Sequence, residues 1–313
     1  MSARCLKALA AICAVLISSV PVVGAPAAEP LRVTEIAPGV FVHEGLVALA
    51  APANAGAIAN SGFIIGRDAV AVIDTEGSRA AGQGLLAAIR QRTALPIRYV
   101  INTHVHPDHV LGNAAFKGAG TTFVGHAQLP AALAAREAFY LTANRALIGP
   151  SFDGTEVVQP TLLVDRTLDL DLGDRLLRIE AWPTAHTNTD VTVYDLTTDT
   201  WFLGDLLFAN HVPALDGRLI GWRKTLQTLR TRTAARVVPG HGPASMPWPA
   251  AAEPTERYLT QLESDLRVMV REGRTLREAA GAAASSEARN WSLFDEFNAR
   301  NATAAFQELE WSE

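Results

Sequence analysis

Cysteine is nearly absent from this sequence of 313 residues. Its two cysteines, Cys5 and Cys13, both lie in an apolar segment near the N-terminus. If that segment is removed from the mature protein, no thiol remains to form a disulfide bond or to bind a metal ion. Disulfide stabilisation and the closed, cysteine-rich type of structural zinc site are therefore excluded for the mature chain.

An excess of positive charge is also lacking. The net charge is −5 at pH 7 and the isoelectric point is about 5.9, so nothing indicates a basic surface, and we expect no nucleic-acid partner. The sequence shows no internal repeat and no low-complexity block. With 49% apolar residues, a chain of this length can bury the core of one large α/β domain.

The N-terminal segment has the pattern of a secretory signal peptide. Arg4 and Lys7 give it a positive start, residues 8–23 are apolar, and Ala25-Pro26-Ala27 offers a small-x-small cleavage site. We expect residues 1–27 to be removed and the mature protein to be periplasmic or secreted, without membrane contact. The alternative is an uncleaved anchor helix, although the apolar run is short for a membrane span. No twin-arginine pair precedes it, which favours export as an unfolded chain.

The most informative stretch is H-V-H-P-D-H at residues 104–109. It places three imidazoles and a carboxylate, all metal-binding groups, within six consecutive positions. Residues two apart in an extended segment face the same side, so His104 and His106 can reach one ion. A turn at the proline lets Asp108 and His109 point at a second ion. The motif follows an apolar run typical of a strand, which predicts a metal site in the loop after that strand.

Three further ligand candidates stand alone in the second half of the chain, each just after an apolar run. Taken singly, each has a simpler explanation, because Gly-Asp pairs commonly form turns and Pro-Gly-His-Gly is a flexible loop. Together they complete the set that the first motif requires. We predict seven ligands for two ions: His104, His106 and His186 for one, Asp108, His109 and His241 for the other, and Asp205 between them.

The motif H-x-H-x-D-H resembles the signature of the metallo-β-lactamase-fold hydrolases, and the other ligands match their dinuclear branch. The resemblance covers residues 31–242 and implies a four-layer αββα sandwich of the α/β class. One departure is Ala185, where the family more often has glycine. Asp74 is on its own most simply a turn residue, but it resembles the strand-end aspartate that orients the metal loop in this family.

The apolar pattern agrees with an α/β fold formed by residues 31–313 as a single domain. Helices are expected at 78–91 and 129–144. The family resemblance implies that the second of them forms a wall of the substrate groove. His126 is interpreted as an exposed or capping residue. Residues 250–313 should form two C-terminal helices packed on the sandwich. Strands are expected at 40–43, 61–66, 69–73, 97–101, 162–170, 176–182, 191–196 and 200–203.

Three short segments resemble sequences of the exported quinoprotein relay system zinc metallohydrolases: G-D-L-L-F at 204–208, V-P-A-L-D-G at 212–217 and G-W at 221–222. This resemblance implies a quinoprotein-system partner but no substrate. The expected protein is a periplasmic hydrolase holding two Zn²⁺ ions, with iron or manganese as alternatives. A metal-bound hydroxide would attack a small ester, thioester, lactone or amide, with Asp108 taking part in proton transfer. The alternatives are a metal-binding or partner module with little turnover, or a β-lactamase.

The signal-peptide interpretation makes a direct prediction about the mature N-terminus. Cleavage after Ala27 avoids leaving Pro26 just past the scissile bond, so the first residue of the secreted form should be Ala28 or one close to it. N-terminal sequencing of protein purified from the periplasm measures this. Recovery of a chain that begins at Met1 or Ser2 would contradict it.

Overall fold

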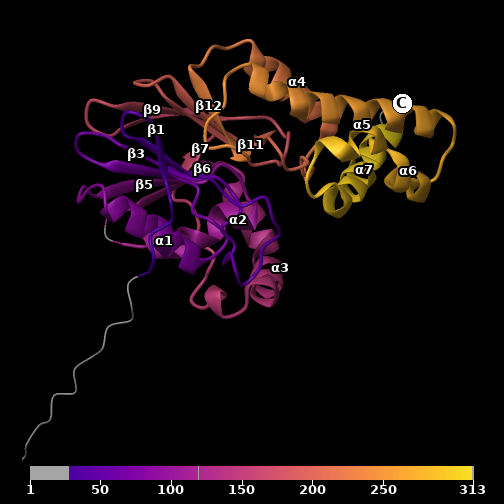
Figure 1. The fold of residues 1–313 in the computed structure, drawn as a ribbon. Coiled ribbons are helices and arrows are strands. Elements are labelled where there is room, and N and C mark those ends of the chain that lie inside the picture. Colours follow the sequence, from indigo (N-terminus) through magenta and orange to yellow (C-terminus); the bar gives the residue numbers. More distant parts are fainter. Residues whose placement is uncertain (1–27, 119, 312–313) are drawn as a thin grey trace, which may run out of the picture.

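Two β-sheets form the centre of the molecule, and helices cover their outer faces (Figure 1). The computed structural model describes residues 28–118 and 120–311, so the predicted signal peptide at 1–27 lies outside the described residues. The arrangement is the mixed α/β, four-layer architecture expected from the sequence.

In the first sheet the strands lie side by side in the order in which they occur in the sequence, and the second sheet is formed by the strands that follow. In the first, β1 to β4 pair antiparallel and β4 to β7 pair parallel. Its strands are β1 (Thr34–Ala37), β2 (Val40–His43), β3 (Ser61–Ile65), β4 (Val70–Ile73), β5 (Ile97–Ile101), β6 (Thr122–His126) and β7 (Leu162–Val164). The second has the order β12-β11-β10-β9-β8, with only the β11–β12 pair parallel. Its strands are β8 (Thr167–Asp171), β9 (Leu176–Ala181), β10 (Val191–Asp195), β11 (Thr200–Phe208) and β12 (Arg236–His241).

The helices divide between the two outer faces (Figure 1). α1 (Arg79–Arg90), α2 (Pro107–Val110) and α3 (Leu129–Ile148) lie on the side of the first sheet. α4 (Leu219–Arg230) covers the second sheet, and α5 (Glu253–Arg271), α6 (Leu276–Ala282) and α7 (Phe294–Glu310) form a group at one end of the molecule. The predicted N-cap Ser78 does start α1, because its side chain accepts a hydrogen bond from the backbone N–H of Ala81.

Strand β4 shows how one apolar segment joins two layers. Val70 and Val72 pack with α1, whereas Ala71 and Ile73 face the second sheet, because successive side chains in a strand point to opposite sides. Both faces are therefore buried, which explains why the strand reads as a continuous apolar run.

Three expectations about element boundaries were wrong. The run at 162–170 is divided into β7 and β8, which belong to different sheets. The strand expected at 200–203 continues to Phe208, so Asp205 lies inside β11 beyond an irregularity at Gly204 and not in a loop. At the C-terminus a further helix, α6, begins at a capping box formed by Thr275 and Glu278.

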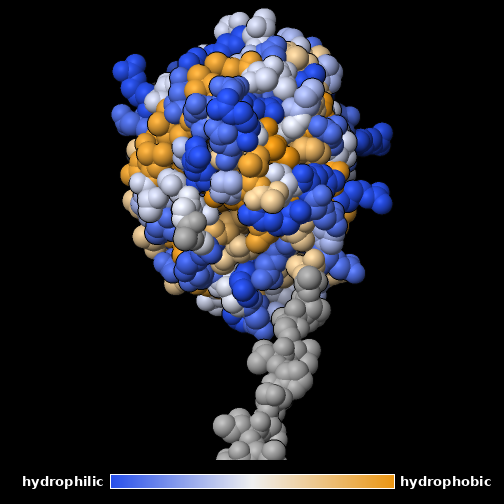
Figure 2. All heavy atoms as spheres, turned by 90° about the vertical axis from the view of Figure 1, so that its left-hand side faces the viewer, coloured by the Kyte–Doolittle hydropathy of each residue, from blue (hydrophilic) through white to orange (hydrophobic). Residues whose placement is uncertain are grey.

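Seen from the side opposite α5 to α7, the surface is a mosaic of hydrophobic and hydrophilic residues (Figure 2). Single apolar residues among charged ones are ordinary on a protein surface. None of the helices in residues 28–118 and 120–311 has the length and apolar character needed to cross a bilayer.

A buried arginine, Arg175, connects the two sheets at the C-terminal end of β10. The guanidinium of Arg175 donates two hydrogen bonds to Asp195, at 3.1 and 2.6 Å, on the second sheet. Its remaining N–H groups donate to the carbonyl oxygens of Pro38 (3.0 Å) and Ile65 (2.9 Å), which belong to the first sheet. Arg175 is 8% exposed and the Asp195 side chain is fully buried, so neither charge has water as an alternative partner.

We predict that Asp195→Ala lowers the free energy of unfolding by about 3–5 kcal/mol, because it leaves a buried guanidinium without its counter-ion. Urea denaturation followed by circular dichroism measures the change. Asp169→Ala is the matched control, since Asp169 makes the same two-bond contact with Arg178 on the exposed surface and should cost less than about 1 kcal/mol. Equal costs for the two substitutions would show that the sheets do not depend on Arg175.

Candidate metal centre

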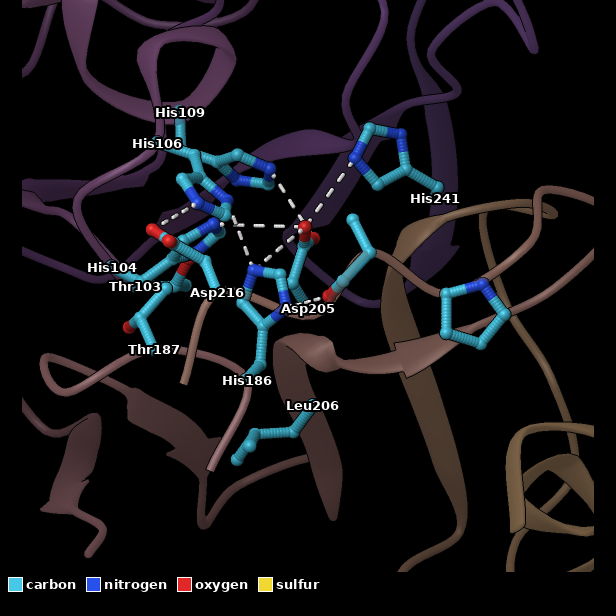
Figure 3. A network of polar contacts seen from close by, with 12 residues as sticks. Thr103, His104, His106, His109, His186, Thr187, Asp205, Leu206, Asp216 and His241 are labelled. Carbon is cyan, nitrogen blue, oxygen red and sulfur yellow. Dashed lines mark hydrogen bonds and ion pairs between the residues drawn. The ribbon is translucent and has the colours of Figure 1, made fainter. Parts of the chain in front are cut away.

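All seven predicted ligands meet at one edge of the sandwich (Figure 3). They come from four segments that lie far apart in the sequence. The loop after β5 carries His104 and His106, and the short helix α2 that follows it carries Asp108 and His109. The loop between β9 and β10 carries one ligand, and the last two lie on β11 and at the end of β12. Their ligand atoms form two groups, each within 4.8 Å: His104, His106, His186 and Asp205 in the first, and Asp108, His109 and His241 in the second.

In the first group, nitrogen atoms face one another across short distances. The Nε2 atom of His186 lies 3.0 Å from Nδ1 of His106 and 3.3 Å from Oδ2 of Asp205. The Nε2 atom of His104 lies 3.6 Å from the same oxygen. Each ring uses its other nitrogen as a donor outside the group, so unprotonated nitrogens point inward. Lone pairs at this separation repel each other unless a cation lies between them, which fits a metal ion with tetrahedral nitrogen and oxygen ligands.

The second group shares Asp205 with the first. His109 Nε2 lies 3.2 Å from Oδ1 of Asp205, and His241 Nε2 lies 3.5 Å from its Oδ2. Asp108 adds its Oδ2 atom 3.4 Å from His241 Nε2 and 3.7 Å from His109 Nε2. The carboxylate of Asp205 is therefore within reach of both groups, the position that the sequence predicted for it.

In each of the five imidazoles, the nitrogen that points away from the ligand group donates a hydrogen bond to a neighbouring oxygen. This contact fixes both the tautomer and the orientation of the ring. The acceptors are Thr103 Oγ1 for His104 (3.0 Å), Asp216 Oδ2 for His106 (3.1 Å), Asp74 Oδ2 for His109 (2.8 Å), Ala214 O for His186 (2.6 Å) and Ile58 O for His241 (3.0 Å).

Asp74 organises the loop that carries the first four ligands. Its Oδ1 accepts the backbone N–H of Thr103 at 2.8 Å, and its Oδ2 accepts the Thr103 hydroxyl at 2.7 Å. The same Oδ2 accepts from His109, so one buried carboxylate positions ligands of both groups. Asp74 has a φ of +56°, a left-handed conformation that turns its side chain from the end of β4 toward the loop.

Two glycines allow the strands to approach Asp205. A Cβ atom at Gly240 would lie 1.8 Å from Oδ1 of Asp205, so β12 could not lie beside β11 with any larger residue. Gly204 has a φ of +53°, and a Cβ there would lie 2.8 Å from the Thr103 side chain. Ala185, where the family more often has glycine, is not among the residues with positive φ, so the alanine causes no backbone strain.

Three buried polar atoms of the centre lack hydrogen-bond partners within the described part of the chain, and the charges of the centre shift one another's pKa values. His104 Nε2, His109 Nε2 and Asp205 Oδ1 are buried and have no hydrogen-bond partner among the described residues. Burial alone would raise the pKa of Asp205, but His109 and His241 hold it well below its ordinary value. Burial alone would lower the pKa of His241, but Asp205 and Asp108 raise it to about 10. Buried polar atoms without partners are costly, and divalent cations would satisfy them.

Some residues around the centre were not predicted from the sequence. Asp216, which fixes His106, stands within the segment that carried the subgroup resemblance, but nothing there indicated contact with a ligand. His211 lies beside His241, with a ring-centroid distance of 5.0 Å, and its Nδ1 donates to the carbonyl oxygen of Val212 (2.5 Å). His126 was left out of the site, and its Nδ1 accepts the backbone N–H of Gln128 at 2.9 Å, in keeping with a local capping role.

A cavity of about 410 Å³ opens directly beside the ligands. Asp108, His106 and His241 form its floor, whereas α3 and α7 supply much of its wall. A small molecule in this cavity could reach His106, Asp108, Asp205 and His241, which line it. The expected groove beside the helix at 129–144 is present along α3, which extends to Ile148.

Comparisons with known proteins agree with this geometry. The sequence model of the Metallo-beta-lactamase superfamily matches residues 55–241, which is more than half of the chain. A metallo-beta-lactamase from Pontibacter korlensis has a TM-score of 0.58 and 22% identity, over 74% of this chain and 99% of that chain. The inverting sec-alkylsulfatase Pisa1 from Pseudomonas sp. has a TM-score of 0.67 and 14% identity, over 89% of this chain and 50% of that chain.

At these identities the structural similarity establishes the fold alone, and this chain spans half the length of the alkylsulfatase. No curated protein sequence matches the chain. The family match includes the four segments that carry the predicted ligands. The chain therefore belongs to the metallo-beta-lactamase superfamily.

Proposed function

We propose that this protein is a periplasmic, dinuclear zinc hydrolase that acts on a small ester, thioester, lactone or amide. Members of the superfamily are hydrolases, and the chain has the His/Asp clusters of a metal-dependent one. The observation that carries the proposal is the position of Asp205, which lies within 3.6 Å of ligand nitrogens in both groups. An arrangement of two groups that share a carboxylate suits two ions better than one.

The donor set suggests which metal is bound. Nitrogen and oxygen donors without sulfur suit Zn²⁺, and iron or manganese also tolerate a bridging carboxylate. When bound as a pair, such ions would lower the pKa of water to about 7 and polarise a carbonyl or phosphoryl oxygen. The protein itself contributes five oriented imidazoles and the cavity beside them.

The two aspartates of the ligand groups, Asp205 and Asp108, differ in exposure, and this separates their roles. The Asp205 side chain is 4% exposed and surrounded by histidines, so it serves as a fixed link between the groups. The Asp108 side chain is 17% exposed and lines the cavity. Asp108 is therefore the carboxylate placed to accept a proton from the attacking water and to pass it to the leaving group.

The cellular role rests on sequence resemblance. The signal-like segment at 1–27 supports a periplasmic location. The sequence segments within 204–222 support a link to a quinoprotein dehydrogenase system. β-Lactamase activity is the second candidate, because solved relatives include metallo-beta-lactamases. Against it, the resemblance associates a bridging aspartate more with lactonase-like, glyoxalase II-like and phosphodiesterase-like hydrolases than with β-lactamases.

A module that binds metal without turnover is the remaining alternative. The zinc-loaded protein should hydrolyse at least one member of a panel of chromogenic esters, thioesters, lactones and a cephalosporin, and a chelator should abolish that activity. Full metal occupancy with no turnover on the whole panel would favour the binding module. Hydrolysis of the cephalosporin alone would favour a β-lactamase.

We predict that the mature protein binds about two zinc ions per chain and that Asp205→Asn retains about one, because the substitution removes the charge that offsets the repulsion between two cations. Turnover at neutral pH should fall by about 100-fold or more, since activation of water depends on both ions. Elemental analysis after dialysis, paired with a thermal melt to check folding, measures the effect.

His104→Ala provides the comparison for Asp205→Asn, because it removes a ligand of the first group only and should cost the other ion. If Asp205→Asn keeps both ions and near-normal hydrolysis, Asp205 is only a strand residue and the dinuclear assignment is wrong.

We also predict that Asp216→Asn weakens zinc binding by about 10- to 100-fold, because an imidazole that loses a carboxylate partner becomes less basic and less well oriented. Asp216 accepts from His106 on the side away from the ligand group. Competition with a fluorescent zinc chelator measures the affinity. Asp153→Asn is the control, because Asp153 forms an exposed pair with Arg145 and contacts none of the ligands.

A further inference from the structure

The wall of the metal-centre cavity has an uneven distribution of charge. Apart from the predicted ligands and Asp216, the charged side chains that line it are two arginines, Arg136 on α3 and Arg300 on α7. The three carboxylates on the lining, Asp108, Asp205 and Asp216, each contact a histidine of the ligand groups. The two arginines are therefore the charged groups of the wall that can attract an anion.

The two guanidinium groups are only partly neutralised by the protein. Arg136 Nη2 lies 3.4 Å from Asp216 Oδ2, and that oxygen also accepts from His106. Arg300 has no ion pair and no side-chain hydrogen bond with any residue in 28–118 or 120–311. A planar guanidinium without a partner can donate two parallel hydrogen bonds to an incoming carboxylate.

A buried phenol lines the same cavity as the two arginines. Tyr140 follows Arg136 by one helical turn on α3, is 7% exposed, and its hydroxyl has no hydrogen-bond partner within the described part of the chain. Burial raises the pKa of Tyr140, and Asp216 and Asp108 raise it further, whereas Arg136 and Arg300 lower it. The phenol therefore remains a hydrogen-bond donor at neutral pH, on the same cavity wall as the two guanidinium groups.

We propose that Arg300, Arg136 and Tyr140 form a carboxylate-binding subsite, and that the substrate of the metal centre carries a carboxylate remote from its scissile carbonyl. The proposal rests on the hydrolase function proposed above and specifies its substrate class. All three side chains present donors, and a carboxylate is an acceptor-only group that can receive several hydrogen bonds at once.

The remaining wall indicates what connects the carboxylate to the reacting group. Leu49, Phe139 and Leu147 line the same cavity, and they are 48%, 71% and 53% exposed, which leaves apolar surface for a ligand to cover. An aliphatic segment would bury this surface at about 25 cal/mol per Å². The structure thus favours monoesters or monothioesters of aliphatic dicarboxylic acids over neutral esters of the same length.

Two substrates of matched length test the subsite. The mono-para-nitrophenyl ester of glutaric acid ends in a carboxylate, whereas para-nitrophenyl pentanoate ends in a methyl group. We expect the zinc-loaded protein to show a higher kcat/KM for the acidic ester, and Arg300→Gln to reduce the acidic-to-neutral ratio by about 10- to 100-fold, the loss expected for a charge-assisted hydrogen bond. Tyr140→Phe should reduce the ratio by a smaller factor, because it removes a neutral donor.

Arg277→Gln is the matched control, because Arg277 is an exposed arginine on α6 that does not line the cavity. It should leave the ratio at the wild-type value. Zinc content and circular dichroism are measured for every variant, so that loss of metal or of folding is recognised. High salt should reduce the preference of the wild-type protein, because partly exposed charges are screened.

Binding measured without turnover separates this proposal from the hydrolase function. Isothermal titration calorimetry with glutarate should give a Kd that Arg300→Gln raises by about 10-fold or more, while pentanoic acid amide should show no such dependence. If glutarate binding depends on Arg300 but neither ester is hydrolysed, the subsite stands and the hydrolase function fails. If the esters are hydrolysed and neither the ratio nor the glutarate affinity changes in Arg300→Gln, the subsite is overturned. Absence of both glutarate binding and a preference for the acidic ester would overturn it as well.

Discussion

The buried carboxylate of Asp205 is the constraint around which the site is built. A negative charge that is 4% exposed must be surrounded by cations or donors, and here it is surrounded by imidazole nitrogens from three other segments of the chain. Bringing those segments together requires both sheets to end at the same edge. It also requires Gly240, because any side chain at that position would overlap Asp205. The packing of the strands and the charge of the site are therefore determined together.

The sequence predicted much of the fold and all seven residues of the two ligand groups. The four ligands of the first motif could be predicted because the alternation of side chains in an extended segment and the turn at Pro107 are local properties of the sequence. The remaining three were recognised only as a set, because a single His or Asp after a strand has several ordinary roles. Asp205 was nevertheless expected in a loop, and the extension of β11 to Phe208 depends on pairing with β12, which is a long-range contact.

The features that the sequence could not predict also depend on long-range contacts. The run at 162–170 is apolar throughout, and periodicity does not tell which sheet each half joins. The partnership of Asp216 with His106 spans 110 positions and depends on how a loop folds over the site. The cavity wall depends on how α3 and α7 approach each other across the sheet edge, and α7 lies beyond the part of the chain that matches the family.

The ligand groups each combine residues from both sheets. In the first, His104 and His106 follow a strand of the first sheet, whereas His186 belongs to the second; in the other, His109 and His241 are divided in the same way. An ion in either group is consequently a cross-link between the two halves of the sandwich, and its binding free energy adds to the stability of their interface. Metal supply and resistance to unfolding become linked quantities. A chain of this design would reach its full resistance to proteolysis only after it has acquired metal.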